Sequence, residues 1–320
     1  MLKGGSYIGL FYIIEESKYF NYYNKGIFKI FPKKLIPAIR PKILDILYNT
    51  EGKEIGKVGG ILLNNSSIEK IEKEELVENF IQGINKIKPQ NVEDLIIEDI
   101  SLFSREDIKL IEARTNLKVV DGINTLYMFL PLVLEEIQKY LKEDFRRKEI
   151  LIIGEGDTLT EELVYALHKS VSFISIAGED KEAIENISQS IFKKTGLSIF
   201  YTQNIDKILI NYPIIVNLKD DVLTYLNKFR RGSIIFDFSI SKKLSRSIKD
   251  KKNLVVIEDF MFFQELDMME NPWIQEWVSS KFYDYFKWST DNKQIRFLVD
   301  SNICTMEELI NRRIRQKGTL

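Results

Sequence analysis

Residues 150–163 read ILIIGEGDTLTEEL. An apolar run comes first, then Gly154 and Gly156 with one residue between them, then a helix-like stretch. In a dinucleotide-binding turn the first glycine permits a tight bend, the second lets a pyrophosphate approach the backbone, and a third lets the helix pack closely on the strand. Leu159 stands where the third glycine would be. Such a turn is informative only inside a strand-helix-strand unit.

The sequence around this turn has the pattern of such units. Short β-branched runs alternate with connecting stretches, at residues 150–153, 173–177, 197–200, 213–218, 233–238 and 254–258. Because the apolar residues in these runs are continuous rather than alternating, the runs are typical of strands covered on both faces, as in a parallel α/β sheet. Six strands with crossovers of this length predict a Rossmann-like, doubly wound parallel sheet of about six strands.

At 320 residues the chain is longer than one core usually allows, so we expect two domains. The charged run at 142–149 is a credible junction. The predicted organisation is α/β in class, with an N-terminal α/β domain at 1–148 that holds a substrate or partner, and an NAD(P)-binding domain at 149–262. Residues 263–320 are expected to form helices, at 272–288 and 306–315, that return to the N-terminal domain.

The first half mixes strands and helices. Ser104 precedes a helical stretch and is expected to be its N-cap. The pair Gly59-Gly60 in a strand predicts a bulge or a close approach of backbone. The predicted strands are 7–14, 26–31, 42–48, 55–63, 95–98 and 118–120, and two further helices are predicted at 74–87 and 124–142.

Composition excludes several classes of protein. The net charge of −1 gives no general attraction to nucleic acid or to anionic membranes, so we expect neither as a partner. A single cysteine and a single histidine exclude an intramolecular disulfide framework and a structural zinc site with ordinary ligand spacing. No run approaches the ~20 apolar residues that span a bilayer. The expected location is the cytoplasm, and homo-oligomerisation is left open.

The turn itself carries charges that oppose a phosphate. Glu155 and Asp157 lie where a phosphate would approach, and one carboxylate about 6 Å from a phosphate charge costs roughly 3 kcal/mol at an effective dielectric near 20. Thr158 and Glu161 have the spacing of a capping box, which predicts a helix that starts at Thr158 with its amides partly satisfied from within.

Carboxylates also follow later strands. Glu179 and Asp180 come after the second strand of the sheet, where a carboxylate would hold a ribose 2′-hydroxyl, so NAD is expected in preference to NADP. Asp180 as a simple helix cap is an equal alternative. Asp237 ends the fifth strand at the edge where ligands bind, or caps the following turn. The predicted cofactor-binding residues are Gly154, Gly156, Thr158, Glu179, Asp180 and Asp237.

Several stretches together resemble the long-chain acyl-acyl-carrier-protein reductases, a family grouped with predicted amino acid dehydrogenases and related to shikimate dehydrogenase. The resemblance rests on IGLFYII (8–14), EGKEIGKVGGILL (51–63), VVDGINTLYMFLPLV (119–133), ILIIGEGD (150–157), GSIIFDFSIS (232–241) and LVVIEDFMF (254–262). It implies two domains, a nicotinamide cofactor and reduction of a carbonyl compound.

The chain departs from this family where the chemistry would occur. The resemblance implies a cysteine nucleophile in the region WVSSKFYDYF (277–286), which contains none. Cys304 lies downstream and is expected to be a small buried apolar residue. His168, near the end of the first crossover helix, is expected to be a surface or helix-dipole residue.

Two hypotheses remain, and no catalytic residue is assigned under either. The first is an NAD(P)-binding oxidoreductase that acts on a carbonyl-type small molecule held between the domains, with NAD as the cofactor. The second is a relative that has lost the cofactor and catalysis, and serves as a binding or structural partner of another protein.

Overall fold

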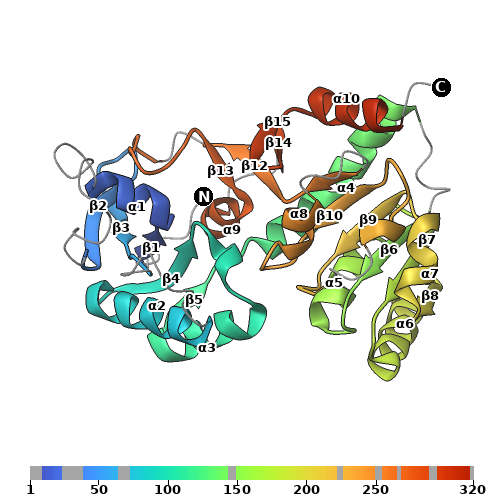
Figure 1. Ribbon diagram of the computed structural model, residues 1–320, viewed down its shortest axis with the longest axis horizontal. Coiled ribbons are helices and arrows are strands. Elements are labelled where there is room, and N and C mark those ends of the chain that lie inside the picture. Colours follow the sequence, from blue (N-terminus) through green and yellow to red (C-terminus); the bar gives the residue numbers. More distant parts are fainter. Residues whose placement is uncertain are drawn as a thin grey trace. The chain divides into compact units, whose positions relative to one another are not determined.

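The computed structural model describes residues 9–23, 39–63, 73–142, 149–221, 226–248, 254–264, 268–287 and 294–317. The chain divides into two compact units, each built from two segments (Figure 1). Unit 1 comprises residues 1–121 and 264–285, and unit 2 comprises residues 122–263 and 286–320. The predicted boundaries at 148/149 and 262/263 differ from this division in two places. Residues 122–148 belong to unit 2 and not to the first domain, and of the C-terminal part only residues 264–285 belong with the N-terminal segment, whereas 286–320 belong to unit 2.

Unit 1 is an α/β unit around a mixed sheet. The elements of unit 1 are β1 (Gly9–Ile13), α1 (Glu16–Tyr23), β2 (Lys42–Tyr48), β3 (Glu54–Gly60), α2 (Lys73–Ile87), β4 (Val92–Ile97), η3 (Ile100–Leu102), α3 (Arg105–Thr115), β5 (Lys118–Val119), β13 (Trp277–Ser279) and α9 (Ser280–Phe286). The sheet has the order β2-β3-β1-β4-β5, in which only β2 is antiparallel to its neighbour. Helices α2 and α3 lie side by side (Figure 1).

Two local predictions in unit 1 can be compared with the structure, and the first is confirmed. Ser104 caps α3, since its hydroxyl accepts from the Asp107 amide while the Asp107 carboxylate accepts from the Ser104 amide at 2.7 Å. A Cβ atom on Gly60 would come within 2.1 Å of the Tyr19 ring, so the close approach at this glycine is made by a side chain and not by backbone as predicted. The strand expected at 26–31 lies outside the described residues.

Unit 2 contains the regular parallel sheet. Its elements are α4 (Ile123–Leu141), β6 (Glu149–Ile153), α5 (Thr158–Leu167), β7 (Phe173–Ala177), α6 (Lys181–Thr195), β8 (Ile199–Thr202), α7 (Ile205–Ile208), η5 (Leu209–Asn211), β9 (Ile214–Asn217), η6 (Leu226–Lys228), β10 (Ile234–Asp237), α8 (Lys243–Ile248), β11 (Val255–Ile257), β12 (Asp259–Phe263), β14 (Ile295–Val299), β15 (Asn302–Cys304) and α10 (Met306–Lys317).

The strand order β11-β10-β9-β6-β7-β8 confirms the predicted fold class. Every neighbouring pair is parallel, and the chain runs outward from β6 to one edge and then from β9 to the other. One face is covered by α8 and by the β8–β9 connection, which form a core with Leu151, Ile215 and Ile235. Alternate residues such as Ile152 are equally buried, so both faces are covered.

The region after residue 262 differs from the prediction. The helix expected at 272–288 is confined to α9, and residues 277–279 form β13 instead. The aromatic residues that suggested a long helix are spread over a turn, a strand and a short helix. The antiparallel pairs β12–β14 and β14–β15 were not predicted. The helix expected at 306–315 is confirmed as α10 and belongs to unit 2, whereas most of α9 belongs to unit 1.

Candidate functional site

The turn after β6 leaves no room for a side chain at either of its glycines. A Cβ atom on Gly154 would lie 2.5 Å from the Thr160 hydroxyl oxygen, so the helix could not pack so closely. Gly156 has φ +76°, and a Cβ atom there would meet Ala183 of α6 at 2.9 Å. Gly154 therefore lets the start of α5 pack closely on the turn, whereas Gly156 supplies the left-handed bend and lets the turn lie against α6.

Asp157, and not Thr158, caps helix α5. Its carboxylate Oδ1 accepts from the Thr160 amide at 3.0 Å and from the Thr160 hydroxyl at 2.7 Å. The capping box predicted for Thr158 and Glu161 is wrong, because the carboxylate one residue earlier takes the capping position. Glu161 instead accepts from Ser190 at 2.8 Å and from Lys194 at 3.1 Å.

Two backbone amides in the first turn of α5 donate no hydrogen bond within the described part of the chain. Among the described residues, no group accepts from the amide of Thr158 or of Leu159. The first amides of a helix have no intrahelical acceptor and favour negative charge. Thr158 thus lies where its backbone can contact an anion, although its side chain is not the cap.

A buried lysine lies at the same edge of the sheet. Lys219 follows β9 by two residues, and its side chain is only 7% exposed. Its Nζ lies 2.5 Å from Glu155, 3.3 Å from Glu179 and 4.0 Å from Asp221. Burial lowers the pKa of Lys219, but the hydrogen bond and charge of Glu155, with Asp221 and Glu179, outweigh burial and raise that pKa above its ordinary value.

These ion pairs join the ends of three neighbouring strands. Glu155 follows β6, Glu179 follows β7, and Lys219 follows β9. Strands β6 and β9 are the pair at which the chain changes direction across the sheet, and ligands bind in open α/β sheets outside the carboxyl ends of such a pair. Sequence reasoning missed Lys219, whose only signal was its place two residues beyond an apolar strand.

Glu179 and Asp180 have different environments. Asp180 caps α6, since its carboxylate accepts from the Ala183 amide at 2.9 Å. This is the cap that the sequence offered as an alternative to a cofactor contact. The Glu179 side chain is 82% exposed and touches Lys219 at its tip. Of the two, Glu179 is therefore the residue with oxygens available to a ligand.

Asp237 is fully buried and its carboxylate is saturated with hydrogen bonds. Oδ1 accepts from Asn217 at 3.0 Å and from the Ser239 hydroxyl at 2.6 Å, and Oδ2 accepts from the Ser245 amide at 3.0 Å and its hydroxyl at 2.6 Å. Lys242 donates to the Asp237 carbonyl oxygen at 2.5 Å. These contacts favour the capping alternative that the sequence left open, because they hold the loop that follows β10.

Asn217 links this network to Lys219. Its Nδ2 donates both to Asp237 and to the Lys219 carbonyl oxygen, the latter at 2.8 Å, and its Oδ1 accepts from the Lys219 amide at 3.2 Å. The backbone of Lys219 is therefore fixed by fully buried groups, while its ammonium reaches the exposed edge.

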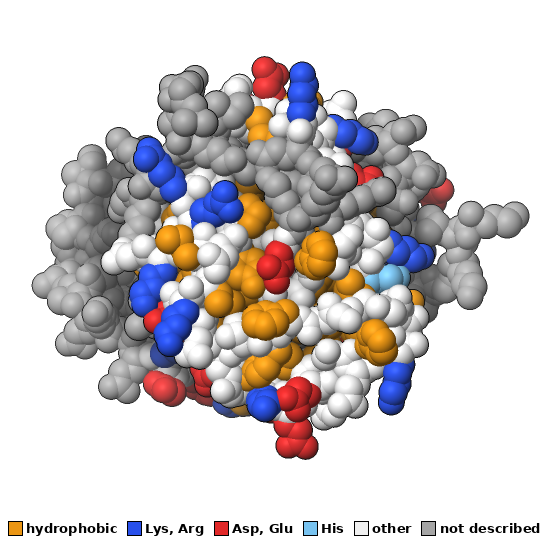
Figure 2. Space-filling model, turned by 90° about the vertical axis from the view of Figure 1, so that its right-hand side faces the viewer, with side chains coloured by type: hydrophobic (Ala, Val, Ile, Leu, Met, Phe, Trp, Pro, Cys, Tyr) orange, Lys and Arg blue, Asp and Glu red, His pale blue; other side chains and the backbone are white. Residues whose placement is uncertain are grey.

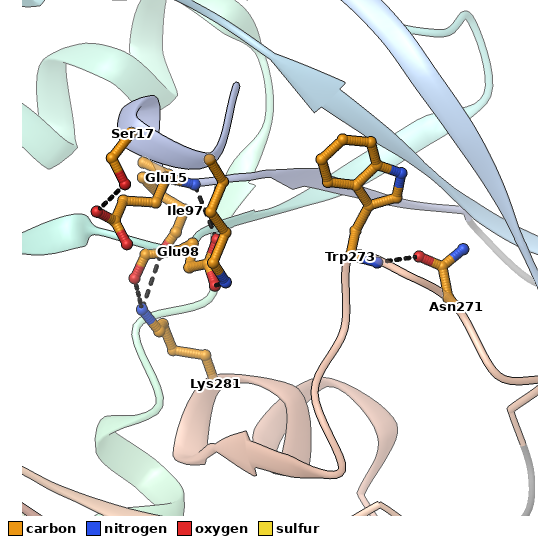
Figure 3. A network of polar contacts seen from close by, with 8 residues as sticks. Glu15, Ser17, Ile97, Glu98, Asn271, Trp273 and Lys281 are labelled. Atoms are coloured by element: carbon orange, nitrogen blue, oxygen red, sulfur yellow. Dashed lines mark hydrogen bonds and ion pairs between the residues drawn. The ribbon is translucent and has the colours of Figure 1, made fainter. Parts of the chain in front are cut away.

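Unit 1 has a separate polar network at the ends of β1 and β4 (Figure 3). The Glu98 carboxylate accepts from the Glu15 amide at 2.8 Å and pairs with Lys18. Buried Lys281 donates to the carbonyl oxygens of Ile97 at 2.8 Å and Glu98 at 2.6 Å. Burial, with the charge and hydrogen bond of Glu98, raises the pKa of Tyr12 well above its ordinary value. These contacts fasten α9 and α1 to the end of β4.

The lone cysteine and histidine have the environments that were expected. Cys304 is 2% exposed, and burial raises the pKa of its thiol. His168 is the C-cap of α5, with Nδ1 2.5 Å from the Tyr165 carbonyl oxygen. A buried thiol with a raised pKa is a poor nucleophile, and the imidazole lies at the C-terminal end of α5, the opposite end from the turn that follows β6.

Among the described residues, no group of three or more histidines, cysteines or carboxylates is arranged to hold a metal ion. Within the same residues, no helix is long and apolar enough to cross a membrane.

Comparison with known proteins gives only remote likenesses. No protein-family model matches the chain, and no curated protein matches it. Among solved structures, the chain is similar to the Δ1-pyrroline-2-carboxylate reductase of Thermococcus litoralis, with 14% identity and a TM-score of 0.29, over 36% of this chain and 35% of that one. It is also similar to the L-tryptophan dehydrogenase of Nostoc punctiforme, with 12% identity and a TM-score of 0.31, over 63% and 56%.

A third match is the iminosuccinate reductase of Paracoccus denitrificans in complex with NAD+, with 10% identity and a TM-score of 0.28, over 36% of each chain. The chain thus spans about a third of the length of the first and third of these structures. These neighbours are dehydrogenases and reductases by name. The fold assignment of unit 2 rests on its own strand order and not on these likenesses.

Proposed function

We propose that unit 2 binds a dinucleotide of the NAD class at the carboxyl edge of its sheet, and that the protein is an oxidoreductase acting on a carbonyl-type small molecule. One observation carries the proposal: the turn Gly154–Gly156 lies at the end of β6, next to β9, where the strand order reverses. This is the position at which open sheets of this order bind dinucleotides.

The residues at this edge supply most of the contacts that a dinucleotide requires. The unpartnered amides of Thr158 and Leu159 suit the pyrophosphate, and the exposed carboxylate of Glu179 suits a ribose 2′-hydroxyl. The same carboxylate would repel the 2′-phosphate of NADP. Asp180 and Asp237 are occupied as caps and contribute by holding the edge in shape.

The charge balance at the edge weakens binding without excluding it. Glu155 and Asp157 each oppose a phosphate, and at about 6 Å one such carboxylate costs roughly 3 kcal/mol at an effective dielectric near 20. The Asp157 carboxylate is directed to its own helix, and Lys219 compensates Glu155.

The hydride chemistry would come from the cofactor, so the chain's own role would be to bind and orient. This division of labour is compatible with a lone cysteine that is buried and a lone histidine that forms the C-cap of α5. The substrate class and a cytoplasmic location are part of the proposal, and the catalytic groups are not assigned.

Calorimetric titration of the purified protein with NADH and with NADPH tests this function. We expect NADH to bind more tightly, and Glu179→Arg to reverse the preference, because an arginine accommodates the 2′-phosphate. Glu182→Arg is the matched control, since Glu182 is an exposed carboxylate in the first turn of α6 and should leave the preference unchanged. Millimolar or absent binding of both nucleotides would instead favour a non-catalytic binding or structural partner.

A further inference from the structure

Lys219 is unusual in its combination of burial and fixed position. Lysine is almost never buried unless it is paired, and here the side chain is 7% exposed with carboxylates around its ammonium. Asn217 holds the lysine backbone from both sides, through its amide donor and its carbonyl acceptor. The ammonium is therefore already desolvated and positioned before any ligand arrives.

The counter-ions of Lys219 are far more exposed to solvent than the lysine itself. The side chains of Glu155 and Glu179 are 52% and 82% exposed, and each can rotate into water without a change in the backbone. The third carboxylate, on Asp221, is 4.0 Å away and 69% exposed. A buried cation covered by exposed, rotatable carboxylates is a site at which another anion can take their place.

We infer that Lys219 is the phosphate-binding cation of this edge and that Glu155 is its built-in competitor, which a ligand phosphate must displace. The inference rests on the proposed function and names the group that would hold the pyrophosphate. Glu155 touches Lys219 and lies in the turn that leads into the free amides of Thr158 and Leu159. An anion that replaces the Glu155 carboxylate would therefore reach both a fixed ammonium and free amide donors.

Lysine binds phosphate as a point charge, and its contribution is large where water is excluded. Displaced Glu155 would be rehydrated at low cost, since half of its side chain already meets solvent. The dinucleotide affinity would then be set by competition within the chain. If the Lys219–Glu155 ion pair only stabilised the fold, the expected result would differ. Removing either partner would then lower stability without changing the affinity for phosphates.

Calorimetry with ADP, which carries a pyrophosphate, and with adenosine, which carries none, separates these alternatives. In Glu155→Gln the competing charge is removed while the side-chain shape is kept, so ADP should bind on the order of tenfold to a hundredfold more tightly. In Lys219→Met, ADP should bind at least about tenfold more weakly, and Lys219→Arg should recover part of the loss. Adenosine affinity should not change in any of these variants.

Two matched controls exclude a general charge effect. Asp221→Asn removes a carboxylate at 4.0 Å, beyond hydrogen-bond distance, and should change ADP affinity far less than Glu155→Gln. Lys228→Met removes an exposed lysine of the same unit, paired with Asp206 at 2.7 Å, and should leave ADP affinity unchanged. If Lys219→Met does not fold, Glu155→Gln alone tests the inference, because the expected gain in ADP affinity requires a folded protein.

The outcomes distinguish this inference from the proposed function. Unchanged ADP affinity in Glu155→Gln overturns the inference, and tight NADH binding by the same proteins would leave the function standing. ADP binding that responds as expected, without NADH binding to the wild-type protein or to Glu155→Gln, supports the phosphate site and overturns the function. Absence of binding by every probe in every variant overturns both.

Discussion

Oδ2 of Asp237 accepts two hydrogen bonds from Ser245, one from its amide at 3.0 Å and one from its hydroxyl at 2.6 Å. The whole side chain is buried, and the other oxygen is used by Asn217 and Ser239. A carboxylate that serves a cofactor would keep an oxygen for it. Asp237 is better explained as the group that closes the loop between β10 and α8.

This arrangement predicts a stability defect in Asp237→Asn. The new amide would point donor hydrogens at groups that already donate, and hydrogen bonds to a charged partner contribute about 1.5 to 3 kcal/mol each. We expect the free energy of unfolding, measured in urea, to fall by about 3 kcal/mol or more. A variant with wild-type stability but weakened NADH binding would show instead that Asp237 is a ligand-binding residue.

Lys281 gives a second prediction, in unit 1. Lys281→Met leaves the carbonyl oxygens of Ile97 and Glu98 without this donor. We therefore expect the free energy of unfolding, measured in urea, to fall by about 2 to 4 kcal/mol. Lys18→Met is the matched control, because Lys18 pairs with the partly exposed carboxylate of the same Glu98 and should cost roughly 0 to 1 kcal/mol. Equal losses in the two variants would contradict a special role for the buried lysine.

A third prediction concerns the cap of α5. Asp157→Ala removes the acceptor for the Thr160 amide and should cost about 1 kcal/mol, whereas Asp157→Asn keeps an acceptor and should cost little. Asp157→Asn also removes one charge that opposes a phosphate, so nucleotide affinity should rise. Thermal unfolding measures the loss of stability in Asp157→Ala. Ser198→Ala, at an exposed serine, is the control. A cap at Thr158 would make Thr158→Ala the more damaging change.

Glu258 provides a prediction about pH. Burial raises the pKa of its carboxyl, with Asp237 and Asp300 adding to the rise and Lys242 opposing it. A raised pKa in the folded state favours the neutral form. Its contribution to stability is fully present below the unfolded pKa, about 4.3, and is lost as the pH rises through the folded pKa.

Glu258→Gln stays neutral at every pH, so its stability relative to wild type should improve as the pH is raised from 4 to 8. Urea unfolding at several pH values measures this difference. Glu93→Gln, at an exposed position of β4, is the control, and its stability relative to wild type should change less with pH. A difference for Glu258→Gln that does not change with pH would mean that the buried carboxyl ionises as easily as it does in the unfolded chain.

The parallel sheet of unit 2 could be predicted because its information is local. The run FISIA at 173–177 is apolar at every position except Ser175, and residues 174–177 of this strand are buried on both faces of the sheet. The cap at Ser104 was predictable for the same reason, since an acidic side chain three residues later completes it. In both cases neighbours in sequence are neighbours in space.

Other features depend on contacts between distant residues. Nothing near Lys219 in sequence indicates that Glu155 lies 2.5 Å from its ammonium. The stretch 272–279 has aromatic residues at helical spacing, yet β13 forms there, and pairing with another strand leaves no local signature. At the start of α5 the sequence predicted the cap at Thr158, and the structure places it one residue earlier, at Asp157.

The two-segment construction of unit 1 has a consequence for the order in which the protein can fold during synthesis. Residues 264–285, which include Lys281, belong to the same unit as residues 1–121. The chain between these two segments contains every strand of the parallel sheet of unit 2. A ribosome therefore delivers the last piece of unit 1 only after that sheet has been translated. Domains usually fold as units from the N-terminus during synthesis. Here the first unit to begin is expected to wait, with the end of β4 uncovered, until the second has largely emerged.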